Sequence, residues 1–339
     1  MLSKLFESLY HKVFVNIVVE RSQSVVYIEV SNKKGIVSGE HESFQTTTLN
    51  SKMYDYINSF INESPFYYIS VLDTSGDQGA IPTCSTRDMP IFCHIESSKY
   101  MCYKKKWAYY TSKIDLNSLQ QNYADIGVDF IFSPFVVLAN FFKDKIDNNL
   151  ALYILIEDNY ITLGVYDNSE LLYGDHIDME HGNEKEELLI DDSHEENIEL
   201  DLDSGIDLES IDAMDDIEGL DDFGDIEDLD SIDEIDEFAE EEEEEEEEFA
   251  DIADESHEDV TEGFNEDYQR FSLIQSSINA FYKDSKYQSK FVESVYIADG
   301  AGVSGDLKRY LEEEMFLSVF VRHLDLGTEV CETAKAELK

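Results

Sequence analysis

The chain has 339 residues and a formal net charge of −53 at pH 7, but the acid is unevenly distributed. Residues 184–263 contain 41 Asp or Glu and one Lys, so the other 259 residues carry a net charge of only −13. Nucleic acid is excluded as a ligand, because phosphates would be repelled and no Lys/Arg-rich stripe compensates. The longest apolar run, residues 130–142, is shorter than the roughly 20 residues of a membrane-spanning helix. Without a signal-peptide pattern at its start, the chain is expected to be cytoplasmic.

The four cysteines are too few for a disulfide framework in a chain of this length, and we expect ordinary buried thiols in a reducing compartment. Cys84, Cys93 and Cys102 follow one another at intervals of nine residues, with His94 adjacent. This spacing raises the alternative of a metal site. It lacks the CxxC pairs typical of zinc sites, so no metal is predicted.

The first half begins with three β-rich segments separated by polar turns, which predict an antiparallel meander. Apolar residues at helical spacing and a buried strand follow, and then a second helix–strand pair. Ser133 and Pro134 suit the N-cap and first position of a further helix. The predicted strands are residues 14–20, 24–31, 35–40, 66–72 and 128–132, and the predicted helices are residues 53–61, 116–126 and 134–142.

The second half repeats this pattern. A constant offset of 135 residues pairs Ile28 with Leu163, Ile36 with Leu171 and Gly39 with Gly174, among other matches. The predicted strands are residues 152–156, 160–166, 170–173, 292–298 and 316–321; the helices are residues 268–281 and a segment capped by Ser304.

Both halves therefore follow the order βββαβαβ, and a duplicated unit of this kind is the plan of the actin-like, ribonuclease H-like α/β fold. We predict a first domain over residues 1–147 with a small inserted subdomain near 76–114. The second domain comprises residues 148–183 and 264–333. The acidic segment 184–263 is predicted to be a disordered insertion that replaces a subdomain.

Three features make the sequence similar to a known family. They are the two meanders, the segment 277–302 with its Gly300-Ala301-Gly302 turn, and the short start at residues 1–6. Together they resemble the type IV pilus protein PilM and the cytoplasmic domain of the type II secretion protein GspL. These are bacterial actin-like proteins akin to FtsA.

The resemblance implies two phosphate-binding hairpin turns, each with a DxG pattern. Here Val18 and Glu20 occupy the Asp and Gly positions of the first turn, and Leu155 and Glu157 those of the second. A Glu side chain hinders close backbone approach and adds negative charge facing a polyanion. We therefore predict degenerate phosphate turns, a pseudo-ATPase and no bound ATP or Mg²⁺. Direct Mg²⁺ ligation by Glu20, Glu157 and Asp158 is the open alternative.

The third nucleotide element of the family, the glycine turn under the adenosine, corresponds to Gly300 and Gly302. Such a turn is also needed for close strand–helix packing when no nucleotide binds. Its presence therefore supports the fold more than a ligand.

The resemblance also implies a groove, formed by the first domain and its small subdomain, for the cytoplasmic N-terminal tail of a single-pass membrane protein. Aromatic rings beside lysines suit such a partner. The candidate partner-binding residues are Tyr100, Tyr103, Lys104, Lys105, Lys106, Trp107, Tyr109 and Tyr110. The alternative is ordinary strand surface with a solvated lysine edge.

In the acidic segment, apolar residues recur every three positions from Leu208 to Phe238. A period of three drifts around a helix instead of forming one stripe. The pattern is typical of disordered binding segments. Calcium buffering is an alternative, although no EF-hand loop is present.

The sequence thus predicts an actin-like scaffold, peripheral to the inner membrane, that docks the tail of a PilN-like protein in an envelope-spanning machine. That machine is a type IV pilus, a type II secretion system, a DNA-uptake system or a flagellar motor with co-opted parts. A homo-oligomeric ring is compatible with this role. The alternatives are an active actin-like ATPase that polymerises with nucleotide and an acidic-tract binding protein for basic partners.

Overall fold

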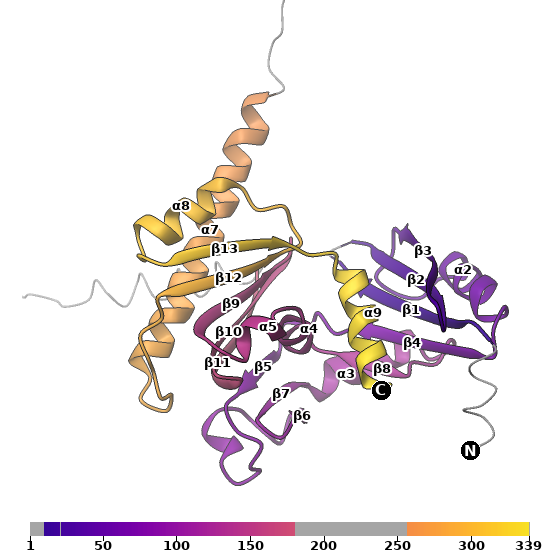
Figure 1. The fold of residues 1–339 in the computed structure, drawn as a ribbon, viewed down its shortest axis with the longest axis horizontal. Helices are drawn as coiled ribbons and strands as arrows, with labels where there is room; N and C mark the ends of the chain where they lie inside the picture. The colour runs from indigo at the N-terminus through magenta and orange to yellow at the C-terminus, as the bar shows by residue number, and fades with distance from the viewer. Residues whose placement is uncertain (1–9, 21, 180–255, 339) are drawn as a thin grey trace, which may run out of the picture. The chain divides into compact units, whose positions relative to one another are not determined.

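Two five-stranded sheets built from β-branched and aromatic residues organise the chain (Figure 1). The structure is a computed structural model and describes residues 10–20, 22–179 and 256–338; within 256–265 only the backbone is described. All described residues belong to one compact unit.

The first sheet has the strand order β3-β2-β1-β4-β8. Its central strand β1 is buried along six consecutive positions, as expected for an apolar strand covered on both faces. The pairing is antiparallel for β1–β2 and β2–β3, and parallel for β1–β4 and β4–β8. The strands are β1 (Lys12–Val19), β2 (Ser24–Asn32), β3 (Gly35–Phe44), β4 (Phe66–Leu72) and β8 (Phe130–Phe132).

The second sheet repeats this plan in the order β11-β10-β9-β12-β13. Its strands are β9 (Leu150–Ile156), β10 (Tyr160–Asp167), β11 (Glu170–Asp178), β12 (Ser294–Asp299) and β13 (Ser318–His323). The duplicated βββαβαβ fold predicted from the sequence is confirmed, and the offset of 135 residues places β2 on β10 and β3 on β11.

The helices begin at residues whose side chains satisfy free backbone amides. Asn50 caps α2 (Ser51–Ile61) by accepting from the Met53 amide, and the predicted cap Ser304 accepts from the Asp306 amide of α8 (Gly305–Glu313). Helix α4 (Pro134–Phe141) begins after Ser133 as predicted, but the Ser133 hydroxyl instead donates to Oε1 of Gln78. The remaining helices are α3 (Lys113–Asn122), α5 (Lys143–Ile146), α7 (Ser256–Lys283), α9 (Leu326–Glu337) and the short 3₁₀ helix η1 (Met89–Ile91).

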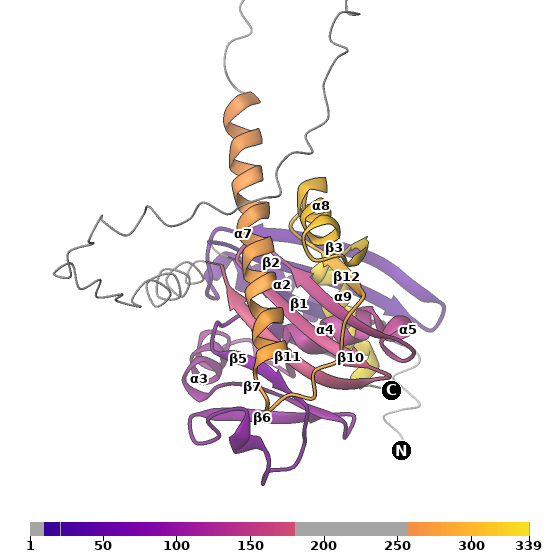
Figure 2. The ribbon, with the colours of Figure 1, turned by 90° about the vertical axis from the view of Figure 1, so that its left-hand side faces the viewer.

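Helix α7 lies along the second sheet (Figure 2). Its residues Phe271, Ile274, Ile278 and Phe281 are buried in one cluster with strands β9, β10 and β12. Residues 184–255 of the predicted acidic insertion lie outside the described residues. The last part of the predicted insertion, residues 256–263, belongs to α7, which begins at Ser256. The N-terminal residues 1–9 are also outside the described part. None of the described helices is both long and apolar enough to cross a membrane.

Helix α9 follows the last strand of the second sheet and packs on the first sheet, an element that the sequence did not predict (Figure 1). Its Val330, Cys331 and Ala334 are buried with Phe14 and Leu72. The last helix therefore joins the two halves of the chain.

A three-stranded sheet with the order β5-β7-β6 forms the small subdomain. Its strands are β5 (Gln78–Ile81), β6 (Ser98–Tyr103) and β7 (Trp107–Ser112). Cys84 and Cys102 form a disulfide here, which corrects the expectation of free thiols; Cys93 and Cys331 remain free. The sequence pattern missed the pair because the strand pairing of β5 and β6 with β7, not local spacing, brings the two cysteines together.

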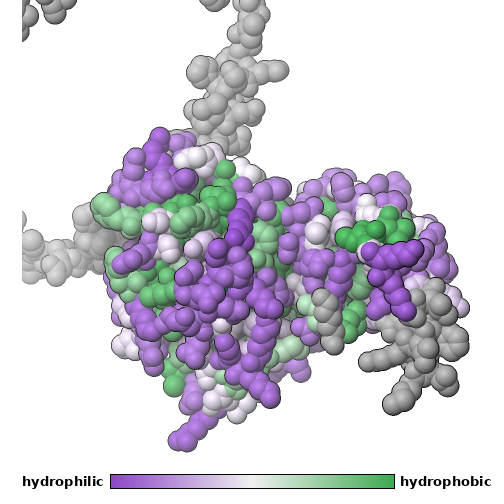
Figure 3. Space-filling view, in the orientation of Figure 1, coloured by the Kyte–Doolittle hydropathy of each residue, from purple (hydrophilic) through white to green (hydrophobic). Residues whose placement is uncertain are grey.

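Apolar side chains also gather on the surface over the edge strand β13 (Figure 3). Phe316, Phe320 and Val321 are exposed there.

Candidate functional site

The two predicted phosphate turns are both tight hairpin turns. In the first, the Glu20 amide donates to the Gln23 carbonyl at 2.8 Å, and Gln23 Nε2 donates to Glu20 Oε2 at 2.6 Å. In the second, the Glu157 amide donates to the Tyr160 carbonyl at 3.0 Å. The Glu20 carboxylate is therefore engaged by a side chain of its own turn.

Val18 and Leu155, at the positions of the expected metal-binding Asp residues, are 4% and 0% exposed. Each lies in an apolar cluster that combines residues of both halves: Val18 shares its cluster with Val330 of α9, and Leu155 shares its cluster with Phe135 of α4. Neither position offers an oxygen to a metal or to its water ligands.

The carboxyl group of Glu157 lies against Gly300, the first glycine of the predicted adenosine turn. A Cβ atom built on Gly300 would lie 2.0 Å from Glu157 Oε1, and the Gly300 amide donates to the Ile156 carbonyl at 3.0 Å. Only a glycine admits the carboxyl group at this distance. The second hairpin turn and the glycine turn are far apart in sequence. The Glu157 side chain, which stands where the DxG pattern has a glycine, brings them into contact.

This carboxyl group is in a strongly unfavourable position for a charge. Glu157 Oε1 is buried without a hydrogen-bond partner among the described residues. Burial raises the pKa of Glu157 to about 8, with further contributions from Asp158, Glu20, Asp299 and Asp325. Because Glu20 belongs to the first hairpin turn, the two turns face each other closely enough to interact electrostatically. Any further anion would meet the same negative field.

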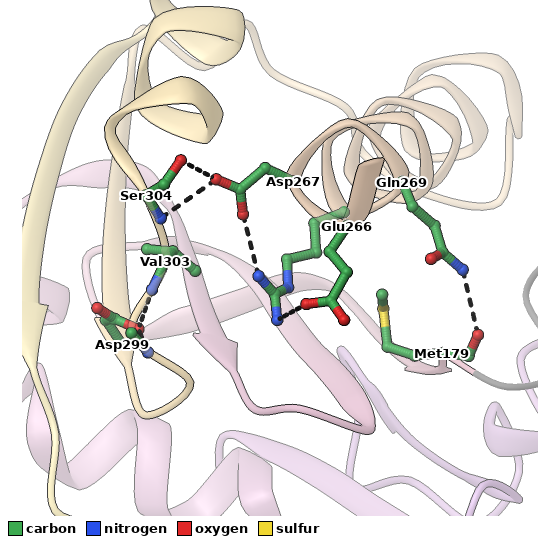
Figure 4. Close-up of polar contacts among 9 residues, drawn as sticks. Met179, Glu266, Asp267, Gln269, Asp299, Val303 and Ser304 are labelled. Carbon is green, nitrogen blue, oxygen red and sulfur yellow. Dashed lines mark hydrogen bonds and ion pairs between the residues drawn. The ribbon is translucent and has the colours of Figure 1, made fainter. Parts of the chain in front are cut away.

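The backbone amides of the glycine turn are already occupied. Asp299 Oδ1 accepts from the Gly302 amide at 2.8 Å and from the Val303 amide at 3.0 Å (Figure 4). Amides at the start of a helix are the groups that bind phosphate in other proteins. Here an internal carboxylate satisfies them.

Helix α7 holds the same turn from the other side. Asp267, 1% exposed, accepts from the amide and hydroxyl of Ser304 and pairs with Arg270 Nη1 at 3.0 Å (Figure 4). The Arg270 guanidinium also lies 3.4 Å from Glu266. The contacts of Asp267 with Ser304 and Arg270 were not predicted from the sequence. Their only trace in the sequence is an Asp and an Arg three residues apart at the start of a predicted helix.

The residues present do not fit a nucleotide with Mg²⁺. The turns carry Glu in place of Gly, the amides of the glycine turn are capped, and the cluster between the turns is acidic. Among the described residues, no group of three His, Cys, Asp or Glu is placed to hold a metal ion. Glu157 covers Gly300, and Asp299 and Asp267 bind the loop 302–304. This set of internally bonded residues is called the closed cleft below.

A groove of about 280 Å³ lies elsewhere, between the small subdomain and the first half. Its walls come from β6 and β7, from α3, and from the segment around β8. The lining residues used below are Met101, Tyr109, Leu116 and Ile131, and the rim includes Lys99 and Asp129. Tyr109 Oη lies 3.0 Å from the Met101 sulfur, so two side chains of the groove wall already contact each other.

The structure places the predicted partner-binding residues in different surroundings. Tyr100 and Tyr109 line the groove. Tyr110 packs on the small core of the subdomain. Tyr103 donates from its hydroxyl to Asn140 Oδ1 at 2.8 Å, which ties it to α4.

Trp107 corrects the prediction, because it is only 2% exposed and cannot contact a partner directly. Its ring lies edge-on to Tyr166 of the second sheet, with ring centroids 6.0 Å apart. Lys104, Lys105 and Lys106 form the exposed turn between β6 and β7, and do not line the groove. Lys104 and Lys105 adopt left-handed φ angles of 49° and 63°.

The duplicated strand order is that of an actin-like fold. A family model described as "Domain of unknown function (DUF8341)" matches residues 152–339, more than half of the chain, and the chain belongs to this family. A second model, "Domain of unknown function (DUF8569)", matches residues 10–139. No curated protein matches the sequence.

Solved structures with a similar fold include a Bacteroides thetaiotaomicron protein with an actin-like ATPase fold and unknown function. It shares 8% identity at a TM-score of 0.43, over 97% of this chain and 98% of that one. A "PilM-PilN type IV pilus biogenesis complex" shares 10% identity at 0.49, over 96% and 97%. The ethanolamine utilization protein EutJ from Carboxydothermus hydrogenoformans shares 9% at 0.40, over 95% and 89%. These similarities concern the fold alone.

Proposed function

We propose that this protein is an actin-like scaffold without nucleotide chemistry. It docks the cytoplasmic tail of a single-pass, PilN-like inner-membrane protein, which holds it at the membrane as part of an envelope-spanning machine. A pilus, a secretion system, DNA uptake and a flagellar motor with co-opted parts are the candidate machines.

The observation that carries this proposal is the groove between the small subdomain and the first half. Its walls combine apolar side chains from three segments of the chain with the charged residues Lys99 and Asp129, and apolar pockets beside a strand edge can accept side chains of an added peptide. Among the described strands, β6 and β8 are each the last strand of their sheet. Edge strands are the elements to which an extended peptide can add by main-chain hydrogen bonds.

The loss of nucleotide chemistry rests on the closed cleft. Glu157 fills the space above Gly300, and Asp299 and Asp267 bind the amides and hydroxyl of the loop 302–304. A scaffold needs the rigid two-domain frame, but not the reaction. Internal bonds in place of a ligand keep that frame in one arrangement.

A titration of labelled tail peptides tests the proposal. The probes are synthetic N-terminal tails of the single-pass inner-membrane proteins of the same cell, with a sequence-scrambled version of each as control. Fluorescence anisotropy measures their affinity for the full chain. We expect one tail to bind, and Leu116→Ala to weaken its binding about tenfold, a loss of about 1.4 kcal/mol.

The matched control is Ile91→Ala, an apolar side chain of the same subdomain that is 60% exposed and lies outside the groove lining. It should leave the affinity unchanged. If no tail binds, or if both variants bind as the unmodified chain does, the proposal is wrong.

A further inference from the structure

The disulfide of the small subdomain joins the loop after β5 to the edge strand β6. Ile81 of β5 and Cys102 of β6 are both register partners of Ala108 on β7, and Cys84 follows Ile81 by three residues. The Cα atoms of Cys84 and Cys102 are 5.4 Å apart.

Besides the bridge, the loop that it encloses is held by the short helix η1, by the ring contact of Phe92 with Tyr287, and by the bonds that Lys113 donates to the carbonyls of Glu96 and Ser97. Its apolar cluster contains only Ile81, Met89 and Ala108 as fully buried members. A core of this size contributes little stability, so the covalent link is an important further constraint on residues 82–97.

The bridge is accessible to a reductant. Cys102 is exposed and Cys84 is half-buried. Burial raises the pKa of Cys93, the third thiol of the cluster, so Cys93 stays protonated and is a poor internal nucleophile. Opening therefore depends on a thiol from outside the protein.

The same bridge lies beside the groove. Cys102 follows Tyr100 and Met101 on β6, and both of these residues line the groove. Because β6 is the last strand of its sheet, it is held on one side only, by β7. Its position thus depends on β7, on the bridge and on the hydrogen bond from Tyr103 to Asn140.

We propose that the Cys84–Cys102 disulfide is a reversible thiol–disulfide switch that sets the shape of the groove. The regulation of tail binding by this switch rests on the proposed function, in which the groove binds the tail of a membrane protein. A small dithiol attacks the exposed sulfur of Cys102, a mixed disulfide forms, and Cys84 leaves as a thiolate that takes up a proton. The second thiol of the reductant then releases Cys102. The bridge gains two electrons and two protons, and the dithiol becomes a disulfide.

The switch itself is tested without any partner, on the full chain. Maleimide labelling followed by peptide mass spectrometry should find Cys84 and Cys102 blocked after treatment with oxidised glutathione and reactive after dithiothreitol. Hydrogen exchange should then be at least tenfold faster in residues 82–103 of the reduced protein, and unchanged in β12 and β13.

Cys93→Ser is the matched control and should retain the full response. The double variant Cys84→Ser/Cys102→Ser should exchange as the reduced protein does under both conditions. Bridge formation that fails under oxidised glutathione, or equal exchange in the two redox states, would overturn the switch.

The tail peptide that binds the groove should differ at least fivefold in affinity between the two states. Equal affinity would overturn the regulatory part of the proposal. If no tail binds in either state, the proposed function fails, while the exchange measurement still decides whether the disulfide controls β6.

Discussion

Lys335 Nζ lies 2.6 Å from Glu29 Oε2 and so fastens the last helix to the first sheet. Glu29 is fully buried on β2, and Lys335 on α9 is largely covered. Burial alone would lower the pKa of Lys335, but its hydrogen bonds to Glu29 and Glu332 outweigh this and raise it. Lys335 therefore keeps its positive charge at every physiological pH.

Removal of one partner from this pair should be costly. Lys335→Met leaves the Glu29 carboxylate buried without its cation, and we expect the free energy of unfolding to fall by about 3 kcal/mol in urea denaturation. The double variant Glu29→Gln/Lys335→Met should recover most of this loss. Lys308→Met, which breaks an exposed pair with Glu312, should cost about 1 kcal/mol or less. An equally small loss for Lys335→Met would show that α9 is held by its apolar contacts alone.

Glu157 should make the stability depend on pH. Between its ordinary pKa of 4.5 and its value of about 8 here, the folded protein holds a proton that the unfolded chain has lost. The contribution of Glu157 to the free energy of unfolding therefore falls as the pH rises through this window.

Glu157→Gln removes this contribution. Urea denaturation measures the free energy of unfolding of the variant and of the unmodified protein at pH 5 and at pH 8. The difference, variant minus unmodified protein, should rise by on the order of 2 kcal/mol from pH 5 to pH 8. Glu63→Gln, at an exposed carboxyl, is the control and should show no such rise. If the free energies of unfolding of the variant and the unmodified protein differ by the same amount at pH 5 and at pH 8, Glu157 is ionised in the folded state at both pH values.

The closed cleft predicts that Mg-ATP does not stabilise the protein. A ligand that binds only the folded state stabilises it by RT ln(1 + c/Kd), where c is the ligand concentration, so the melting temperature rises once c exceeds the Kd. We expect no measurable shift with millimolar Mg-ATP in differential scanning fluorimetry. A shift that is lost in Asp299→Ala or Asp267→Ala would restore the active-ATPase alternative.

Trp107 should act on stability and not on recognition. It is packed against Tyr103 and Tyr166, with ring centroids 4.7 and 6.0 Å away. Trp107→Ala should lower the free energy of unfolding by about 3 to 5 kcal/mol, as expected for a large buried ring. Tyr166→Phe, which removes only a hydroxyl that is unpaired among the described residues, should cost far less. A Trp107→Ala variant that unfolds at the same urea concentration as the unmodified protein would place the ring at the surface.

The sequence predicted the central strands well because β1, β4, β9 and β10 are largely apolar. β4 was predicted at its observed bounds, residues 66–72, and Ser304 as the cap of α8. Helix α9 escaped prediction because Gly327, Thr328 and Thr333 dilute its apolar pattern, and only the first sheet supplies its partners.

The sites were harder to predict than the sheets. The sequence showed that Glu20 and Glu157 replace glycines, but not that the Glu157 carboxyl group lies on Gly300. It also did not show that Trp107 is buried while Tyr109 lines the groove. The two faces of β7 differ in burial only because other elements pack against them. Long-range pairing decides both cases.

Site-specific photocrosslinking in living cells tests the docking claim most directly. A photoreactive benzoyl-phenylalanine replaces Leu116 in the groove in one strain, and Ile91 outside it in another. The account predicts that position 116 crosslinks to the cytoplasmic tail of one single-pass inner-membrane protein and that position 91 does not. Crosslinking to that tail from position 91 alone, or none from position 116 in a correctly folded protein, would contradict it.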